Sequence, residues 1–164
     1  MTRTIHGWPV IESSSDSRLK DFRVPGTKRS IKLRKDVGGY LVAFASEYHD
    51  QIAPIDTGTF DDWGWCPVRK GRASSQISDH CAGVALDLNA TKEGSQSSSN
   101  VFWRKHPVKA LRMRALLRKY RLLEWGGDYK SFYDPMHLVI KTSSVKSVKD
   151  EMARLGIRPD GTLK

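Results

Sequence analysis

Cysteine is nearly absent from this sequence. Its 164 residues include only Cys66 and Cys81, which is too few for a disulfide framework. The two do not form a C-x-x-C pair, so we expect no zinc site built on cysteine. One bridge between them is conceivable. Cysteine is also often a small buried residue, and we favour that interpretation for Cys81, which lies next to His80.

Long hydrophobic runs are absent as well. No apolar stretch approaches the roughly 20 residues that a helix needs to cross a membrane, so we expect no membrane insertion. The first residues lack the apolar segment of a signal peptide. We therefore expect a protein made in the cytoplasm without a signal peptide, which needs another route of release if it acts outside.

Acidic residues are scarce relative to basic ones. Lys and Arg number 28 against 18 Asp and Glu, which gives a formal net charge of +10. Such a surplus attracts polyanions, among them nucleic acids, anionic lipids and anionic wall polymers. No recognisable nucleic-acid-binding motif accompanies the charge, so we expect no specific nucleic-acid partner.

The length fits a single domain with a substantial core, residues 1–164. Hydrophobic spacing predicts three helices and two strands. The helices span about 31–50, 107–120 and 144–155, and the strands span 84–88 and 136–140. Residues 52–55 could form a further short strand. The predicted fold class is α+β, with a small antiparallel sheet flanked by helices.

The remaining segments are predicted to be irregular. They are the N-terminal arm 1–30, packed on the domain, and two loops at 56–76 and 91–100. Trp8 is a candidate anchor for the arm. The first two helices are predicted to bury one apolar face each, formed by Val37, Leu41, Phe44 and Tyr48 in the first and by Val108, Leu111, Ala115 and Leu116 in the second.

Two short segments contain the residues best suited to bind a metal ion or to transfer protons. His80 and Asp87 stand seven positions apart, and His137 follows about fifty residues later, three positions after Asp134. Two histidines and one aspartate can bind zinc and leave its fourth position open, as in catalytic zinc sites. Asp134 is then a candidate general base. A single histidine is more often structural, but the joint pattern favours a site.

The spacing also constrains the local structure. Because seven is odd, His80 and Asp87 would point to opposite faces of one straight strand. They can converge only if the chain bends between them, and Gly83 is placed to bend it. Pro135 indicates that Asp134 lies before the strand that begins near His137.

The two segments resemble the signatures of a zinc peptidase family that includes D-alanyl-D-alanine carboxypeptidases and L-alanyl-D-glutamate endopeptidases. The matching patterns are Ser78-x-His80-x-x-Gly83-x-Ala85-x-Asp87 and Asp134-x-Met136-His137. The stretches Trp125-Gly126-Gly127-Asp128 and Gly7-Trp8-Pro9 strengthen the likeness, and the second is similar to the start of bacteriophage members. The resemblance implies a Hedgehog/D,D-peptidase-like zinc fold.

The resemblance implies a role for each matching residue. His80, Asp87 and His137 match the ligands of one Zn²⁺ ion, and Asp134 matches the catalytic acid and base. An arginine ahead of the first motif usually binds substrate and steadies the oxyanion; Arg69 and Arg72 compete for this role, and we favour Arg69. The expected substrate-binding residues are Ser78, Trp65 and Trp125.

The function implied by the resemblance is hydrolysis of the peptidoglycan stem peptide at the L-alanyl-D-glutamate bond. The enzyme would be a monomeric phage lysin that acts on the bacterial cell wall, released by a holin or carried on the virion. Anionic wall polymers are possible further partners. Three alternatives stay open: a D-alanyl-D-alanine carboxypeptidase or dipeptidase, a non-catalytic Hedgehog-like binding module, and a nucleic-acid binder motivated by charge alone.

Overall fold

The computed structural model describes residues 1–68, 76–92 and 101–164. Its elements in chain order are β1 (Leu19–Arg23), β2 (Ser30–Arg34), α1 (Gly38–Gln51), the 3-10 helix η1 (Asp79–Ala82), β3 (Ala85–Asp87), α2 (Val101–Lys105), α3 (Pro107–Lys119), β4 (Leu123–Trp125), the 3-10 helix η2 (Gly126–Asp128), β5 (His137–Ile140) and α4 (Val145–Leu155). The predicted α+β class with small antiparallel sheets is confirmed.

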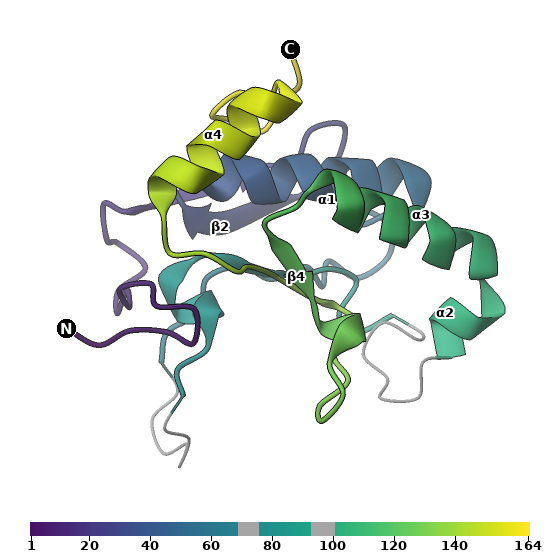
Figure 1. Cartoon of the computed structure of the whole chain (residues 1–164), viewed down its shortest axis with the longest axis horizontal. Helices are drawn as coiled ribbons and strands as arrows, with labels where there is room; N and C mark the ends of the chain where they lie inside the picture. The colour runs from purple at the N-terminus through teal and green to yellow at the C-terminus, as the bar shows by residue number, and fades with distance from the viewer. Residues whose placement is uncertain (69–75, 93–100) are drawn as a thin grey trace.

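Helix α1 is the centre of the core. It runs through the molecule beside α3 and against the β1–β2 hairpin (Figure 1). Its predicted apolar stripe, from Val37 to Tyr48, is buried, so that prediction is confirmed. No helix in the described ranges is long and apolar enough to span a membrane.

The hairpin corrects the predicted N-terminal arm and the predicted start of the first helix. Residues 19–23 and 30–34 pair as antiparallel strands. Ile31 and Leu33 are buried while Lys32 between them is partly exposed, a period of two that defines a strand. The helix begins only at Gly38. A Cβ there would lie 2.4 Å from the Phe22 ring, so glycine lets β1 approach the helix start. Elsewhere in the arm, Trp8 is buried, as predicted.

The predicted inward face of the second long helix is wrong except at Leu116. Val108 and Leu111 are 58% and 69% exposed, Ala115 is exposed as well, and the helix buries Met113 together with the predicted Leu116. Apolar residues lie on several sides of this segment, so its spacing alone does not select a face. Packing against α1 makes that choice. Residues 52–55, a possible strand from sequence, continue irregularly after α1.

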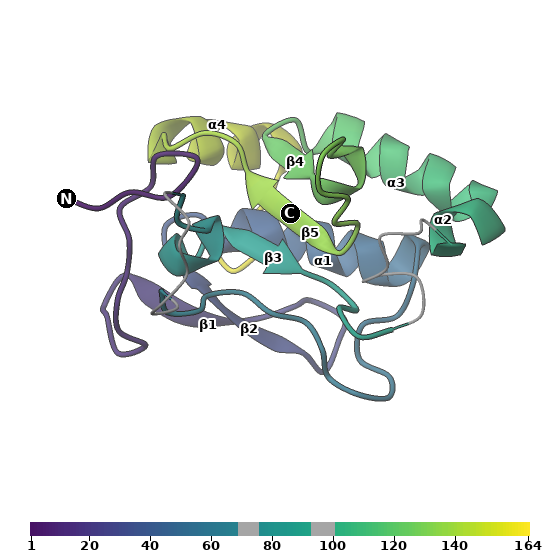
Figure 2. The ribbon, with the colours of Figure 1, turned by 90° about the horizontal axis from the view of Figure 1, so that it is seen from below.

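The three-stranded sheet positions the functional residues. Its order is β3-β5-β4, with both pairs antiparallel. In Figure 2 it lies between the β1–β2 hairpin and helices α3 and α4. The strands predicted at 84–88 and 136–140 are confirmed with shorter bounds, whereas β4 was missed because it has three residues.

The C-terminal helix α4 confirms the prediction for 144–155. Ser144 is its N-cap, and the Ser144 hydroxyl accepts a bond from the main-chain N–H of Ser147. In the predicted loop 56–76, residues 56–68 and 76 are irregular apart from an isolated bridge at Trp63. The loop predictions for 69–75 and 93–100 lie outside the described residues.

Candidate metal and substrate site

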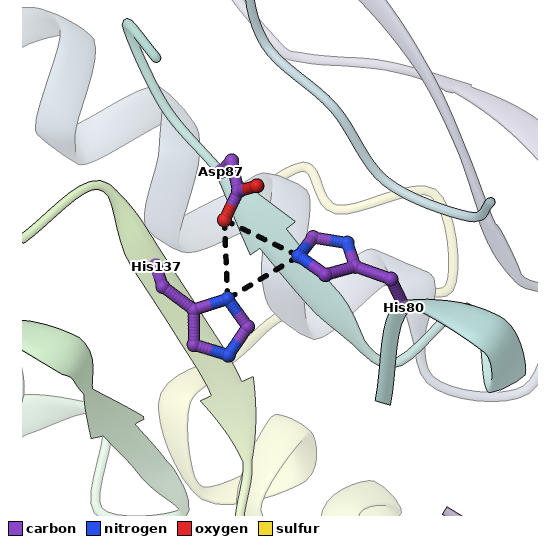
Figure 3. Close-up of side chains that lie close together, drawn as sticks. All are labelled: His80, Asp87 and His137. Carbon is purple, nitrogen blue, oxygen red and sulfur yellow. Dashed lines mark hydrogen bonds and ion pairs between the residues drawn. The ribbon is translucent and has the colours of Figure 1, made fainter. Parts of the chain in front are cut away.

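Three side chains from different elements meet at one point: His80 from η1, Asp87 from β3 and His137 from β5 (Figure 3). Asp87 and His137 are directly opposed in the antiparallel register. Opposed residues point to the same face of a sheet. His80 joins them because Gly83 ends η1 in a left-handed conformation, with φ of 71°, and turns the chain into β3. The predicted bend is therefore present.

The three side chains offer converging ligand atoms. His137 Nδ1 lies 3.1 Å from Asp87 Oδ1, and His80 Nε2 lies 3.2 Å from both of these atoms. Zinc bonds of about 2.0–2.2 Å in a tetrahedral site separate the ligand atoms by roughly 3.3–3.6 Å. The observed separations are close to that range. The triad residues are thus compatible with one face of a tetrahedral metal site.

A backbone carbonyl fixes the orientation of the first histidine. His80 Nδ1 lies 2.6 Å from the carbonyl oxygen of Gly64. A carbonyl oxygen only accepts, so Nδ1 carries the proton and, in the neutral ring, Nε2 presents its lone pair to Asp87 and His137. Metal-binding histidines usually have such an outer hydrogen bond. The donor set therefore fits a cation.

The electrostatics of the triad also favour positive charge at its centre. Burial lowers the pKa of His80, but the hydrogen bond and charge of Asp87 outweigh burial and raise it to about 9. Burial raises the pKa of Asp87, yet the two histidines hold it well below its ordinary value. The side chains thus retain a proton among them, and metal binding to such groups displaces protons.

Asp134 lies beside the triad in the turn before β5. Its main-chain N–H donates to Gly126 O at 3.0 Å, and its carbonyl accepts the His137 N–H at 3.1 Å. Burial and the charge of Asp87 raise the pKa of the Asp134 carboxyl, against the lowering effect of the histidines. A carboxyl with a raised pKa is better suited to exchange protons near neutral pH.

The triad and Asp134 share a cavity of about 910 Å³ with aromatic and polar walls. Among the predicted substrate-binding residues, Ser78 and Trp65 line it. The Ser78 hydroxyl caps η1 by accepting from His80 N, and the Trp65 Nε1 donates to Ile11 O at 3.0 Å. Arg69 and Arg72 lie outside the described residues.

Trp125, the third predicted substrate-binding residue, does not line the cavity. Its side chain is buried, it packs edge-on against Trp103, and its Nε1 donates to Pro135 O at 2.8 Å. It is not among the residues that line the cavity with the triad. The structure thus places Trp125 behind the wall, where it supports the turn that carries Asp134.

Several residues that line the cavity were not predicted from the sequence. His6 Nδ1 lies 2.8 Å from Asp79 Oδ2, and its Nε2 lies 3.6 Å from Glu124. Tyr129 donates to Glu124 at 2.8 Å. The position of Asp79 beside His80 was a possible signal, whereas the contribution of Gly64 is a carbonyl and has no side-chain signal.

The two cysteines belong to the described part of the chain and are not joined by a disulfide. Cys81 is buried in η1, next to His80, as favoured from the sequence.

Comparison with known proteins points to the same chemistry. Residues 72–140 match the model of a family described as D-alanyl-D-alanine carboxypeptidase. This span is less than half of the chain, but it contains the three triad residues and Asp134. Comparison with curated proteins and with solved structures gave no match. The carboxypeptidase family model and the triad together support a metal-dependent peptidase.

Proposed function

We propose that this protein is a zinc-dependent peptidase that hydrolyses the stem peptide of peptidoglycan. The observation that carries the proposal is the meeting of His80, Asp87 and His137 in one cavity with Asp134. The match to the carboxypeptidase family model supports the substrate class. A binding module without catalysis would not need a carboxyl in the same cavity as the triad, which favours an enzyme.

The reaction is addition of water to a peptide carbonyl, with cleavage of the C–N bond. A bound zinc ion supplies a Lewis acid that polarises the carbonyl and acidifies water. Asp134 removes a proton from the attacking water and later delivers a proton to the leaving amine. An arginine of the loop before the first motif, Arg69 or Arg72, stabilises the negative charge on the carbonyl oxygen.

The proposed bond is that between L-alanine and D-glutamate. The resemblance of Gly7-Trp8-Pro9 in the arm to the start of bacteriophage members supports this choice. On that basis the protein is a phage lysin that works at the bacterial wall. The substrate chain lies in the cavity against Ser78 and Trp65, which form part of its wall. A D-alanyl-D-alanine carboxypeptidase, the description of the matching family model, is the second candidate.

Digestion of purified peptidoglycan tests the proposal. Digestion by the zinc-loaded protein is expected to expose new amino termini on D-glutamate. The Asp134→Asn variant is expected to bind zinc but to produce no such termini. Asp128→Asn is the matched control, because Asp128 is exposed and pairs with Arg114.

The reaction products distinguish the endopeptidase from the carboxypeptidase. Release of D-alanine in place of D-glutamate termini would establish the carboxypeptidase instead. A zinc-loaded protein that cleaves neither bond would overturn both assignments.

A further inference from the structure

A short stretch of chain, residues 62–64, touches two of the triad residues through its backbone. Trp63 N donates to Asp87 O at 3.0 Å, and Asp87 N donates to Trp63 O at 2.8 Å. One position later, the carbonyl of Gly64 accepts the His80 Nδ1 bond. The orientation of both triad side chains therefore depends on where residues 62–64 lie, although none of the three is a candidate ligand.

A buried ion pair fixes the beginning of this stretch. Arg29 Nε donates to Asp62 Oδ2 at 2.8 Å, and the Asp62 side chain is fully buried. Arg29 Nη2 also donates to the Asp62 carbonyl at 3.0 Å, so the guanidinium binds side chain and main chain together. The other carboxylate oxygen accepts the Asn89 N–H at 2.8 Å, two residues after Asp87.

The arginine is itself held in place. Its guanidinium carbon lies 4.5 Å from the centre of the Phe60 ring, and its position just before β2 ties it to the hairpin. A planar guanidinium can reach two oxygens and stack on a ring at once, which a lysine ammonium cannot do. The pair thus connects the hairpin rigidly to residues 62–64 and to the chain that follows β3.

We propose that Arg29 and Asp62 are positioning residues that set the affinity of the triad for zinc. Loss of the pair lets residues 62–64 shift, which moves the Gly64 carbonyl away from His80 and loosens the backbone pair at Asp87. This inference rests on the proposed function only in treating the triad as a zinc site. It is independent of the peptide bond that is cleaved.

The competing explanation is that the pair contributes only to general stability. Glu151 provides the comparison, because it is similarly buried and pairs with Arg121 at 3.0 Å and Arg154 at 2.6 Å. Glu151 lies on α4 and does not line the cavity. Glu151→Gln and Asp62→Asn therefore remove the same charge from two buried carboxylates that pair with arginine, one on α4 and one next to the triad.

Zinc dissociation constants, measured by competition with a chromophoric chelator, test the proposal. Removal of a partner outside the ligand shell typically weakens metal binding about 10–100-fold, and we expect this range for Asp62→Asn and Arg29→Met. Arg29→Lys keeps the charge and should lose less. Glu151→Gln should change the zinc dissociation constant less than about threefold, well below that range.

Cobalt substitution supplies a second readout. The visible absorption of the Co²⁺ form reports ligand geometry, and it should change in Asp62→Asn and stay unchanged in Glu151→Gln. Zinc affinities and cobalt spectra like those of the wild type, even with a lowered melting temperature, would overturn the proposal. If Asp62→Asn does not fold, Arg29→Lys decides by the same two measurements.

Failure of this inference differs from failure of the proposed function. A wild-type protein that binds zinc but cleaves no peptidoglycan would refute the proposed peptidase function alone. If the wild type cleaves peptidoglycan and the Asp62 and Arg29 variants bind zinc as tightly as it does, only the positioning role is refuted. A wild-type protein that binds no zinc overturns both.

Discussion

Asp87 and His137 reach the triad on neighbouring strands, whereas His80 reaches it on one turn of 3-10 helix. The strand pair is held mainly by its register, because main-chain hydrogen bonds fix both Cα positions and the face of each side chain, and the backbone pair between Trp63 and Asp87 adds to this support. The orientation of His80 depends instead on a distant carbonyl, that of Gly64. One half of the site is therefore fixed by regular structure and the other half by tertiary contacts.

The largest effect is expected when a candidate zinc ligand is removed from either half of the site. His137→Ala and His80→Ala should each abolish peptidoglycan hydrolysis and weaken zinc binding by more than the roughly 100-fold typical of outer partners. Isothermal titration with zinc and the digestion assay check this. Removal of zinc from the wild type by a chelator should match both variants, and restored zinc should restore only the wild type. Lysis that persists in chelator would refute the metal site.

A smaller effect is expected when only the support of His80 is disturbed. A Cβ at Gly64 would lie 2.3 Å from the Lys32 carbonyl, so Gly64→Ala must displace the backbone. We expect a loss of about 1–3 kcal/mol in the free energy of unfolding and a 10–100-fold weaker zinc affinity, on the order of an outer-partner loss. Denaturant unfolding and zinc titration measure the two quantities.

Gly26→Ala is the control for this variant. Gly26 has a φ of +75°, and a Cβ added there would meet nothing within 4 Å, so the change introduces backbone strain of roughly 1–2 kcal/mol without a clash. It should lower stability and leave zinc affinity unchanged. Equal zinc affinities in Gly64→Ala and the wild type would show that His80 does not need the carbonyl.

The smallest expected effect concerns the contact between the N-terminal arm and η1. The hydrogen bond to Asp79 raises the pKa of His6 above its ordinary value of 6.5. A raised pKa stabilises the fold fully below about pH 6.5, and this contribution disappears as the pH rises through the folded-state pKa. His6→Gln should therefore cost up to about 1 kcal/mol in acid and little in alkali.

Urea unfolding at about pH 5.5 and about pH 9 measures this difference between wild type and variant. His106→Gln is the control, because His106 is exposed at the start of α3. A cost for His6→Gln that does not change with pH would contradict the charged pair.

The same contrast explains what the sequence could predict. The three triad residues and Asp134 lie in two short segments, so residue types and spacing identify them without knowledge of the rest of the fold. Gly64, Arg29 and Asp62 act across long separations through carbonyls and buried charges, which leave no local pattern.

The errors in secondary structure have a related cause. Strand β2 is only five residues long and precedes α1 closely, so the helical spacing downstream masked its alternation. On α3 the buried face is selected by α1 rather than by the helix's own sequence. In both cases the neighbouring elements decide what the local spacing leaves open.

The N-terminal arm carries a practical consequence for anyone who produces this protein. Ile5 and His6 line the cavity, so residues fused ahead of Met1 would lie only a few residues along the chain from the cavity wall. Lys164 instead follows α4, where its N–H donates to Gly156 O, and Figure 1 places the two chain ends apart. An affinity tag or a fused wall-binding module therefore belongs at the C-terminus, where it leaves the cavity open.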